Sequence, residues 1–160
     1  MAIQVGDKIP HVTIMTMGAE GPEPVDTADF FAGKKVALFA VPGAFTPTCS
    51  AKHLPGFLAH VDDLKVKGVD AVACVSVNDV FVMDAWGKSA EVAGRIAMLA
   101  DGNGAFAAAL GLELDGTGFG MGKRSQRFSM VVDGGTVMVL NVEEPGAFYA
   151  SSAEHMLTQL

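Results

Sequence analysis

The sequence predicts an α/β fold with a mixed central sheet that carries helices on both faces. Three apolar runs have the length of buried strands, and a helical pattern follows each; they span residues 35–41, 69–77 and 96–99. Two further strand-like stretches, 127–132 and 136–142, flank Asp133-Gly134-Gly135, which is a hairpin signal. The expected order is therefore β-α-β-α-β-α, then a β-hairpin and a last helix.

The first strand stops at Pro42-Gly43, and a helix is expected after it. Apolar residues recur there at spacings of three and four, at Leu54, Phe57, Leu58, Val61 and Leu64. Gly68 ends this helix. Pro55 has no N–H to bond back to Ala51, so we expect a kink in the first turn.

The remaining helices and loops are predicted from capping residues and from local composition. Asn78-Asp79 can cap a short helix that runs to Trp86. Residues 105–110 are rich in alanine and predict another helix, whereas the glycine-rich stretch 111–122 predicts a loop. Ser151-Ser152 can cap a terminal helix that runs to Gln159. With 160 residues and no linker or repeat, we expect one domain over 1–160.

Composition and charge argue against several classes of protein. Eleven basic and eighteen acidic residues give a formal charge of −7, and the scattered Lys and Arg predict no nucleic-acid partner. The longest apolar runs fall far short of the ~20 residues of a membrane span. Two cysteines do not make a disulfide scaffold, and the first residues do not resemble a signal peptide. We expect a cytoplasmic protein, with a matured organellar form as the alternative.

The chemically informative segment runs from Val41 to Cys49, where a buried strand ends and a helix begins. The free N–H groups and partial positive charge of a helix N-terminus favour a thiolate over a thiol, which makes Cys49 a candidate nucleophile. Thr46 lies three residues earlier, where its hydroxyl can donate to the thiolate and accept from a peroxide. One alternative is a buried structural cysteine at 49, but its Pro-Gly and Thr-Pro-Thr neighbours argue against a position in a core. For Thr46 the alternative is an ordinary helix cap.

The pattern Pro42-x-x-x-Thr46-x-x-Cys49 resembles the active-site signature of peroxiredoxins. Two later blocks also resemble the peroxiredoxin-5, or type II, group: 72–79 together with Trp86, and 127–132. The resemblance implies a thioredoxin-like fold, a peroxidatic role for Cys49, and binding and activation of a hydroperoxide by Thr46 and Arg127.

The same resemblance implies that Pro42, Gly43 and Thr48 border the substrate and that no metal or organic cofactor is needed. Arg127 opens a predicted strand, and its permanent charge would stabilise the thiolate and polarise the peroxide. A surface salt bridge is the alternative for this residue. The first product would be a sulfenic acid at Cys49.

The reductant is predicted from what the sequence lacks. Some members of the group resolve the sulfenic acid with a cysteine near the C-terminus, but the comparable stretch 143–152 has none. We therefore expect an external thiol, with glutathione and glutaredoxin favoured over thioredoxin. Cys74 lies in an apolar strand and is expected in the core, with a resolving role as the alternative.

Other functions are considered as alternatives to a peroxidase. The same cysteine could serve a peroxide sensor or a redox-signalling module. A thiol-disulfide oxidoreductase is disfavoured, since Cys49 is followed by Ser50-Ala51-Lys52 and no Cys-x-x-Cys motif exists. By resemblance, Phe45, Phe81 and Phe119 form a homodimer contact.

For several other polar residues we expect structural or solvent-exposed positions. We expect His53 to be a hydrogen-bonded structural histidine, with a role in the pocket as the alternative. Lys123 and Arg124 are expected to be solvated charges. The four histidines do not show the spacing of a metal site.

Overall fold

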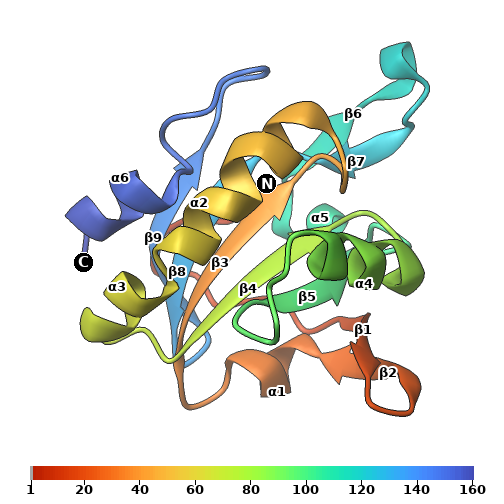
Figure 1. The fold of residues 1–160 in the computed structure, drawn as a ribbon. Helices are drawn as coiled ribbons and strands as arrows, with labels where there is room; N and C mark the ends of the chain where they lie inside the picture. Colours follow the sequence, from red (N-terminus) through yellow and green to blue (C-terminus); the bar gives the residue numbers. More distant parts are fainter. Residues whose placement is uncertain (1) are drawn as a thin grey trace.

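The computed structural model describes residues 2–160 and has a seven-stranded mixed sheet at its centre (Figure 1). The spatial order is β2-β1-β5-β4-β3-β8-β9, with a separate two-stranded sheet of β6 and β7. The seven strands are β1 (Thr13–Gly18), β2 (Gly21–Asp26), β3 (Lys35–Val41), β4 (Ala71–Ser76), β5 (Ala97–Ala100), β8 (Phe128–Asp133) and β9 (Thr136–Val142). β3, β4 and β5 are parallel, whereas β1, β2, β8 and β9 join by antiparallel pairing. The predicted mixed sheet is confirmed.

Strand β3 lies in the interior of the sheet, between β4 and β8, and contributes to two cores. Its side chains alternate between the faces, so Ala37, Phe39 and Val41 pack into one core while Val36 and Leu38 pack into the other. Both faces are buried, which explains why the strand reads as a continuous apolar run.

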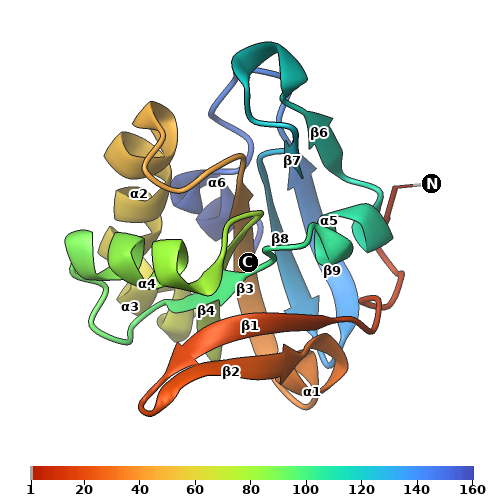
Figure 2. The same ribbon diagram turned by 90° about the vertical axis from the view of Figure 1, so that its right-hand side faces the viewer.

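Helices cover both faces, as predicted (Figure 2). The first face carries α2 (Leu54–Ala59), α3 (Val61–Val66), α4 (Val80–Ser89) and α6 (Ala153–Thr158). The second face carries α1 (Thr27–Phe31) and α5 (Ala105–Leu110). Among residues 2–160, no helix has the length and apolar character needed to cross a membrane.

The end signals in the sequence were largely correct. Asp79 caps α4 by accepting from the Val82 N–H at 2.9 Å, and Ser152 caps α6 by accepting from the His155 N–H at 3.1 Å. The hairpin β8–β9 turns through Gly134 and Gly135, whose φ angles of +57° and +86° are accessible to glycine at little cost.

Two parts of the structure differ from the sequence expectations. The hairpin β1–β2 and helix α1 lie in a region for which no element was predicted. The stretch 111–122 is not simply a loop, because it contains β6 (Glu113–Asp115) and a 3₁₀ turn (Thr117–Phe119); β6 pairs with β7 (Lys123–Ser125). Strands of three residues are too short to produce a readable alternation of apolar and polar side chains.

Both outer strands of the sheet have limited capacity to pair further. β2 contains Pro22 and Pro24, which have no N–H to offer to another strand. The start of β9 is covered by the N-terminal segment. The N–H of Gly6 donates to Val137 O at 2.8 Å, and the N–H of Val137 donates to Asp7 O at 2.9 Å. Farther along β9, Asn141 is hydrogen-bonded to Gln159 through side chains.

Candidate active site

Cys49 lies in the first turn of the helix that follows β3. The chain leaves β3 at Val41, and helical backbone begins at Pro47, where a missing N–H is tolerated. The N–H of Ser50 donates to Thr46 O at 2.9 Å. The sulfur is thus attached near the positive end of a helix, as the sequence predicted.

The predicted kink in this helix is a π-helical turn over Cys49–His53. The N–H of Leu54 donates to Cys49 O, five residues back, and the following Pro55 has no N–H to donate. Helix α2 then continues to Ala59, and α3 is separated from it at His60. Cys49 and His53, the first and last residues of this wide turn, are both buried.

The Cys49 side chain is buried, with 0% of its surface exposed. This corrects the expectation that its Pro-Gly and Thr-Pro-Thr neighbours keep it out of a core. Cys49 packs in the same cluster as Phe39 and Leu54. A buried thiolate is costly unless another group pairs with it.

Arg127 provides that pairing. Strand β8 is antiparallel to β3, and Phe128 pairs with Ala40, so Arg127 lies beside the end of β3. Its Nη2 donates to Cys49 Sγ at 3.1 Å. A guanidinium in this position stabilises the thiolate through a charge-assisted hydrogen bond. Two residues 78 positions apart are therefore brought together, as the resemblance implied.

His53 contacts the other terminal nitrogen of Arg127. Arg127 Nη1 donates to His53 Nδ1 at 2.8 Å, and His53 Nε2 contacts Ser151 O at 3.0 Å. Burial and, secondly, the charge of Arg127 lower the pKa of His53 to about 3. The imidazole is therefore neutral at physiological pH, carries its proton on Nε2 and accepts at Nδ1.

The expectation of a hydrogen-bonded histidine is confirmed, but its contact with Arg127 was missed. The sequence contains no local signal for a contact across 74 positions.

Glu143 organises the loop that presents Ser151 to His53. Its carboxylate accepts from the Tyr149 N–H at 2.7 Å, from the Ser151 N–H at 2.8 Å and from the Ser151 hydroxyl at 2.7 Å. Burial raises the pKa of Glu143, but these donors outweigh burial and bring its pKa below the usual range. A continuous series of contacts thus runs from Glu143 through Ser151, His53 and Arg127 to Cys49. The sequence interpretation considered this stretch only for its lack of cysteine.

The Thr46 hydroxyl donates to Gly43 O at 2.8 Å. Its single proton is committed to this bond, so its remaining capacity is as an acceptor. Of the two roles expected for Thr46, this arrangement favours accepting from a peroxide over donating to the thiolate. A Cβ on Gly43 would come within 3.2 Å of Thr46 Cγ2 and of Met121 Cε, which explains the glycine.

Arg124 is a correction to the sequence interpretation. It is half-buried, and it donates through Nε to Met121 O and through Nη1 to Val77 O, each at 2.9 Å. It therefore ties the β6–β7 hairpin to the end of β4. Lys123 is exposed, as expected.

Cys74 lies in β4, opposite Phe39 of β3, and is buried. Burial and, to a smaller extent, the neighbouring Cys49 raise the pKa of Cys74 well above its usual value. It remains a neutral thiol at physiological pH, which supports the predicted core role.

A cavity of about 330 Å³ is lined by Arg127, whereas Cys49 and Thr46 are not among its lining residues. Pro42, Thr48 and Arg127 form one part of its lining, which places two of the three predicted substrate-binding residues at the cavity. Gly43 is not among the lining residues; it contributes its carbonyl to Thr46 instead.

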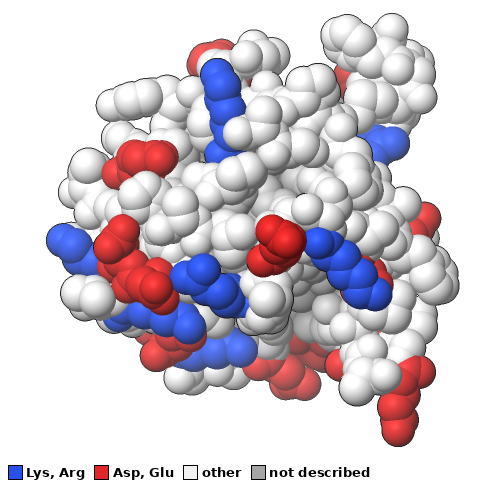
Figure 3. All heavy atoms as spheres, viewed as in Figure 1, with Lys and Arg blue, Asp and Glu red and all other residues white. Residues whose placement is uncertain are grey.

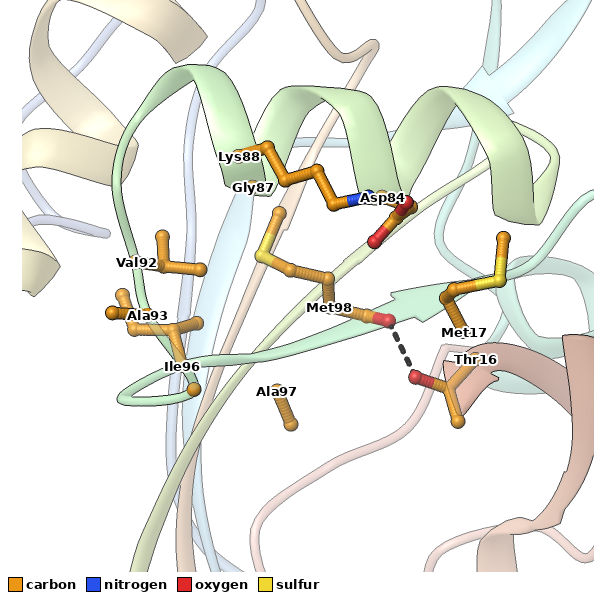
Figure 4. Close-up of a pocket in the computed structure, with 11 residues that line it drawn as sticks. Thr16, Met17, Asp84, Gly87, Lys88, Val92, Ala93, Ile96, Ala97 and Met98 are labelled. Carbon is orange, nitrogen blue, oxygen red and sulfur yellow. Dashed lines mark hydrogen bonds and ion pairs between the residues drawn. The ribbon is translucent and has the colours of Figure 1, made fainter. Parts of the chain in front are cut away.

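A larger cavity of about 410 Å³ lies elsewhere, between α4, β5 and β1 (Figure 4). Its polar side chains are already paired: Thr16 donates to Met98 O at 3.0 Å, and Lys88 contacts Asp84 at 2.9 Å. None of the predicted site residues lines it, so the smaller cavity is the candidate active site. Within residues 2–160, no group of three or more His, Cys, Asp or Glu side chains is arranged to hold a metal ion.

Known proteins share both the sequence and the fold. The Redoxin family model matches residues 4–157. The chloroplastic Peroxiredoxin-2E of Arabidopsis thaliana is 49% identical over 163 aligned positions, which cover 99% of this chain and 70% of the relative.

Two solved structures agree with this match. Reduced Prx3 of Vibrio vulnificus in complex with hydrogen peroxide superposes with a TM-score of 0.95 at 52% identity, covering 98% of each chain. Peroxiredoxin 5 of Alvinella pompejana gives a TM-score of 0.85 at 36% identity, covering 98% of this chain and 96% of that one. The chain therefore belongs to the peroxiredoxin family, in its type II (peroxiredoxin-5) group, has the thioredoxin-like fold and is a thiol peroxidase.

Proposed function

We propose that Cys49 is the peroxidatic residue and that Arg127 and Thr46 are its catalytic partners. The observation that carries this proposal is the 3.1 Å hydrogen bond from Arg127 Nη2 to the buried Cys49 sulfur. The thiolate attacks the terminal oxygen of a hydroperoxide, so an S–O bond forms while the O–O bond breaks. The departing alkoxide or hydroxide takes a proton from water, and Cys49 is left as a sulfenic acid.

The neighbouring groups orient the peroxide in this proposal. Thr46 accepts from the peroxide O–H, because its own proton is bonded to Gly43 O. The helix N-terminus and Arg127 stabilise the charge that moves onto the departing oxygen. Pro42 and Thr48, which line the cavity, limit access of water to the sulfur.

For the reductant we propose glutathione with glutaredoxin. The segment 143–152 contains no second thiol, and Cys74 is buried within the sheet. A glutathione thiol attacks the sulfenic sulfur, releasing water and forming a mixed disulfide. A second thiol then attacks the glutathione sulfur, which frees Cys49 and yields a glutathione-containing disulfide.

A cytoplasmic location remains our proposal, because two free thiols suit a reducing compartment. The chloroplastic relative from Arabidopsis thaliana keeps an organellar location as the alternative.

We also propose that the chain forms a homodimer through an aromatic surface made of Phe45, Phe81 and Phe119. These side chains are 52%, 64% and 87% exposed, and contact with a second copy of the chain would remove their apolar surface from water. Acidic and basic side chains are interspersed on the face seen in Figure 3, so charge alone does not single out a contact there.

The catalytic assignment predicts different effects of the two cysteines. Cys49→Ser should reduce the rate of peroxide consumption to the uncatalysed background, because serine is not ionised at neutral pH. Cys74→Ser should keep the peroxide-reacting step within a few-fold of the original rate. Stopped-flow measurement with hydrogen peroxide tests both variants. Turnover by the Cys49→Ser protein would remove the basis of the mechanism.

The reductant assignment predicts sustained turnover with glutathione and glutaredoxin and slower turnover with thioredoxin and its reductase. Steady-state assays should be run separately with each system, and the oxidised protein should be analysed by mass spectrometry. A glutathione mixed disulfide on Cys49 is expected. A Cys49–Cys74 disulfide would contradict the reductant proposal. Oxidation of Cys49 without turnover in either system would favour the hypothesis of a peroxide sensor.

The neutral state of His53 predicts a pH dependence of stability. Its pKa is about 3 in the folded state and about 6.5 when unfolded, so the unfolded chain binds more protons between these values. The stabilisation is complete above pH 6.5 and falls as the pH drops, by up to about 1.4 kcal/mol per pH unit. The variant His53→Gln, which can accept from Arg127 and donate to Ser151 O, should lose this part of the slope in urea titrations.

His60 provides the matched control for this experiment. Its contact with Asp63 raises the pKa of His60, so its contribution has the opposite sign and is lost as the pH rises. His60→Gln should leave the acid-side slope in place. Equal slopes for His53→Gln and the original protein would show that His53 is not held neutral.

The proposed dimer predicts that Phe119→Ser lowers the apparent mass in sedimentation velocity toward that of one chain. Met138→Ser provides a control, since Met138 is also exposed, at 53%, but lies in β9. A monomer in the unmodified protein at micromolar concentration would rule out a stable dimer.

A further inference from the structure

We infer that the cavity beside Arg127 selects hydroperoxides by charge, favouring uncharged organic hydroperoxides over those that carry a carboxylate. This inference rests on the proposed function of Cys49 and names the substrate class that its site prefers.

The cavity is larger than hydrogen peroxide requires. A water molecule occupies about 30 Å³ of liquid, whereas the cavity measures about 330 Å³. Leu114, Pro145 and Ala147 give part of its lining an apolar character. An alkyl group can therefore lie against these residues while the peroxide group is near Arg127.

The charged lining is mainly acidic. Glu113, Asp115, Glu143 and Glu144 line the cavity together with Arg127. Hydrogen bonds from Thr117 lower the pKa of Asp115, and the donors around Glu143 lower its pKa, so both are ionised at neutral pH. Arg127, the one basic lining residue, already donates to Cys49 and His53.

A carboxylate on the substrate would therefore meet negative charge without an unengaged cation among the lining residues. In water, one unit charge about 8 Å away changes the local concentration of an anion about twofold. Several such charges act together, and salt weakens them because the Debye length is about 8 Å at physiological ionic strength. An uncharged hydroperoxide of the same shape does not experience this repulsion.

The test compares two hydroperoxides that differ in charge and by one ester methyl group. One is 3-hydroperoxy-3-methylbutanoate, which is tert-butyl hydroperoxide with a carboxylate on one methyl group, and the other is its methyl ester. The oxidation rate of Cys49 can be followed by the fluorescence of Trp86, the only tryptophan, whose Nε1 donates to Ser50 Oγ at 3.1 Å. Each rate is divided by the rate of the same compound with free cysteine, which corrects for intrinsic reactivity.

At low ionic strength we expect the ester to react about fivefold faster than the carboxylate after this correction. In 0.5 M salt the ratio should approach one. The double variant Glu113→Gln/Glu144→Gln should lower the ratio about threefold at low salt. The matched control is Glu20→Gln, which removes the same kind of charge from the exposed turn between β1 and β2 and should leave the ratio unchanged.

Equal corrected rates for the two compounds at low salt would overturn the inference. An effect of Glu20→Gln as large as that of the double variant would also overturn it, because net charge would then explain the result. Hydrogen peroxide is the reference substrate that distinguishes a failure of charge selection from a failure of the proposed function. If it oxidises Cys49 but the ratio is one, only charge selection fails; if it does not oxidise Cys49, the proposed function itself fails.

Discussion

The burial of the Cys49 sulfur is the constraint on which this site depends. In the proposed mechanism this sulfur carries negative charge, and a buried charge is stable only where fixed donors replace water. The helix N-terminus supplies one part of that environment, and Arg127 Nη2, 3.1 Å from Cys49 Sγ, supplies the other. Arg127 is in turn held by a neutral His53, which Ser151 and Glu143 keep in place. The position of one charge thus depends on contacts that reach the loop following β9.

Much of the fold could be predicted, because its central strands are buried on both faces and therefore read as apolar runs. Strand β3 and helix α5 match their predicted ranges, and the Gly134-Gly135 turn was signalled by residues that tolerate positive φ. The hairpin β1–β2 was missed because its side chains are mostly part-exposed and β2 contains two prolines, which are uncommon in strands. This hairpin is stabilised by pairing with β5 and by packing, and neither can be recognised from the local order of apolar and polar residues.

The candidate site, like the fold, could be predicted from the sequence only in part. Cys49, Thr46 and Pro42 form a local motif, so their spacing was readable. His53 was noticed but its partner was not, since the contact with Arg127 depends on how β8 pairs with β3. The burial of Cys49 was also misjudged: its Pro-Gly and Thr-Pro-Thr neighbours argued against a core position, whereas Cys49 and His53 of the π-helical turn are both buried. Long-range pairing and local helix geometry are set by the whole fold.

The outer strands of the sheet have a consequence for how copies of the chain can associate. Pro22 and Pro24 leave β2 a poor template for an added strand, and the N-terminal segment occupies the start of β9 at Val137. Addition of a further strand is thereby hindered at β2 and at the start of β9. These features favour association of copies through side-chain surfaces over extension of the sheet from one chain to the next.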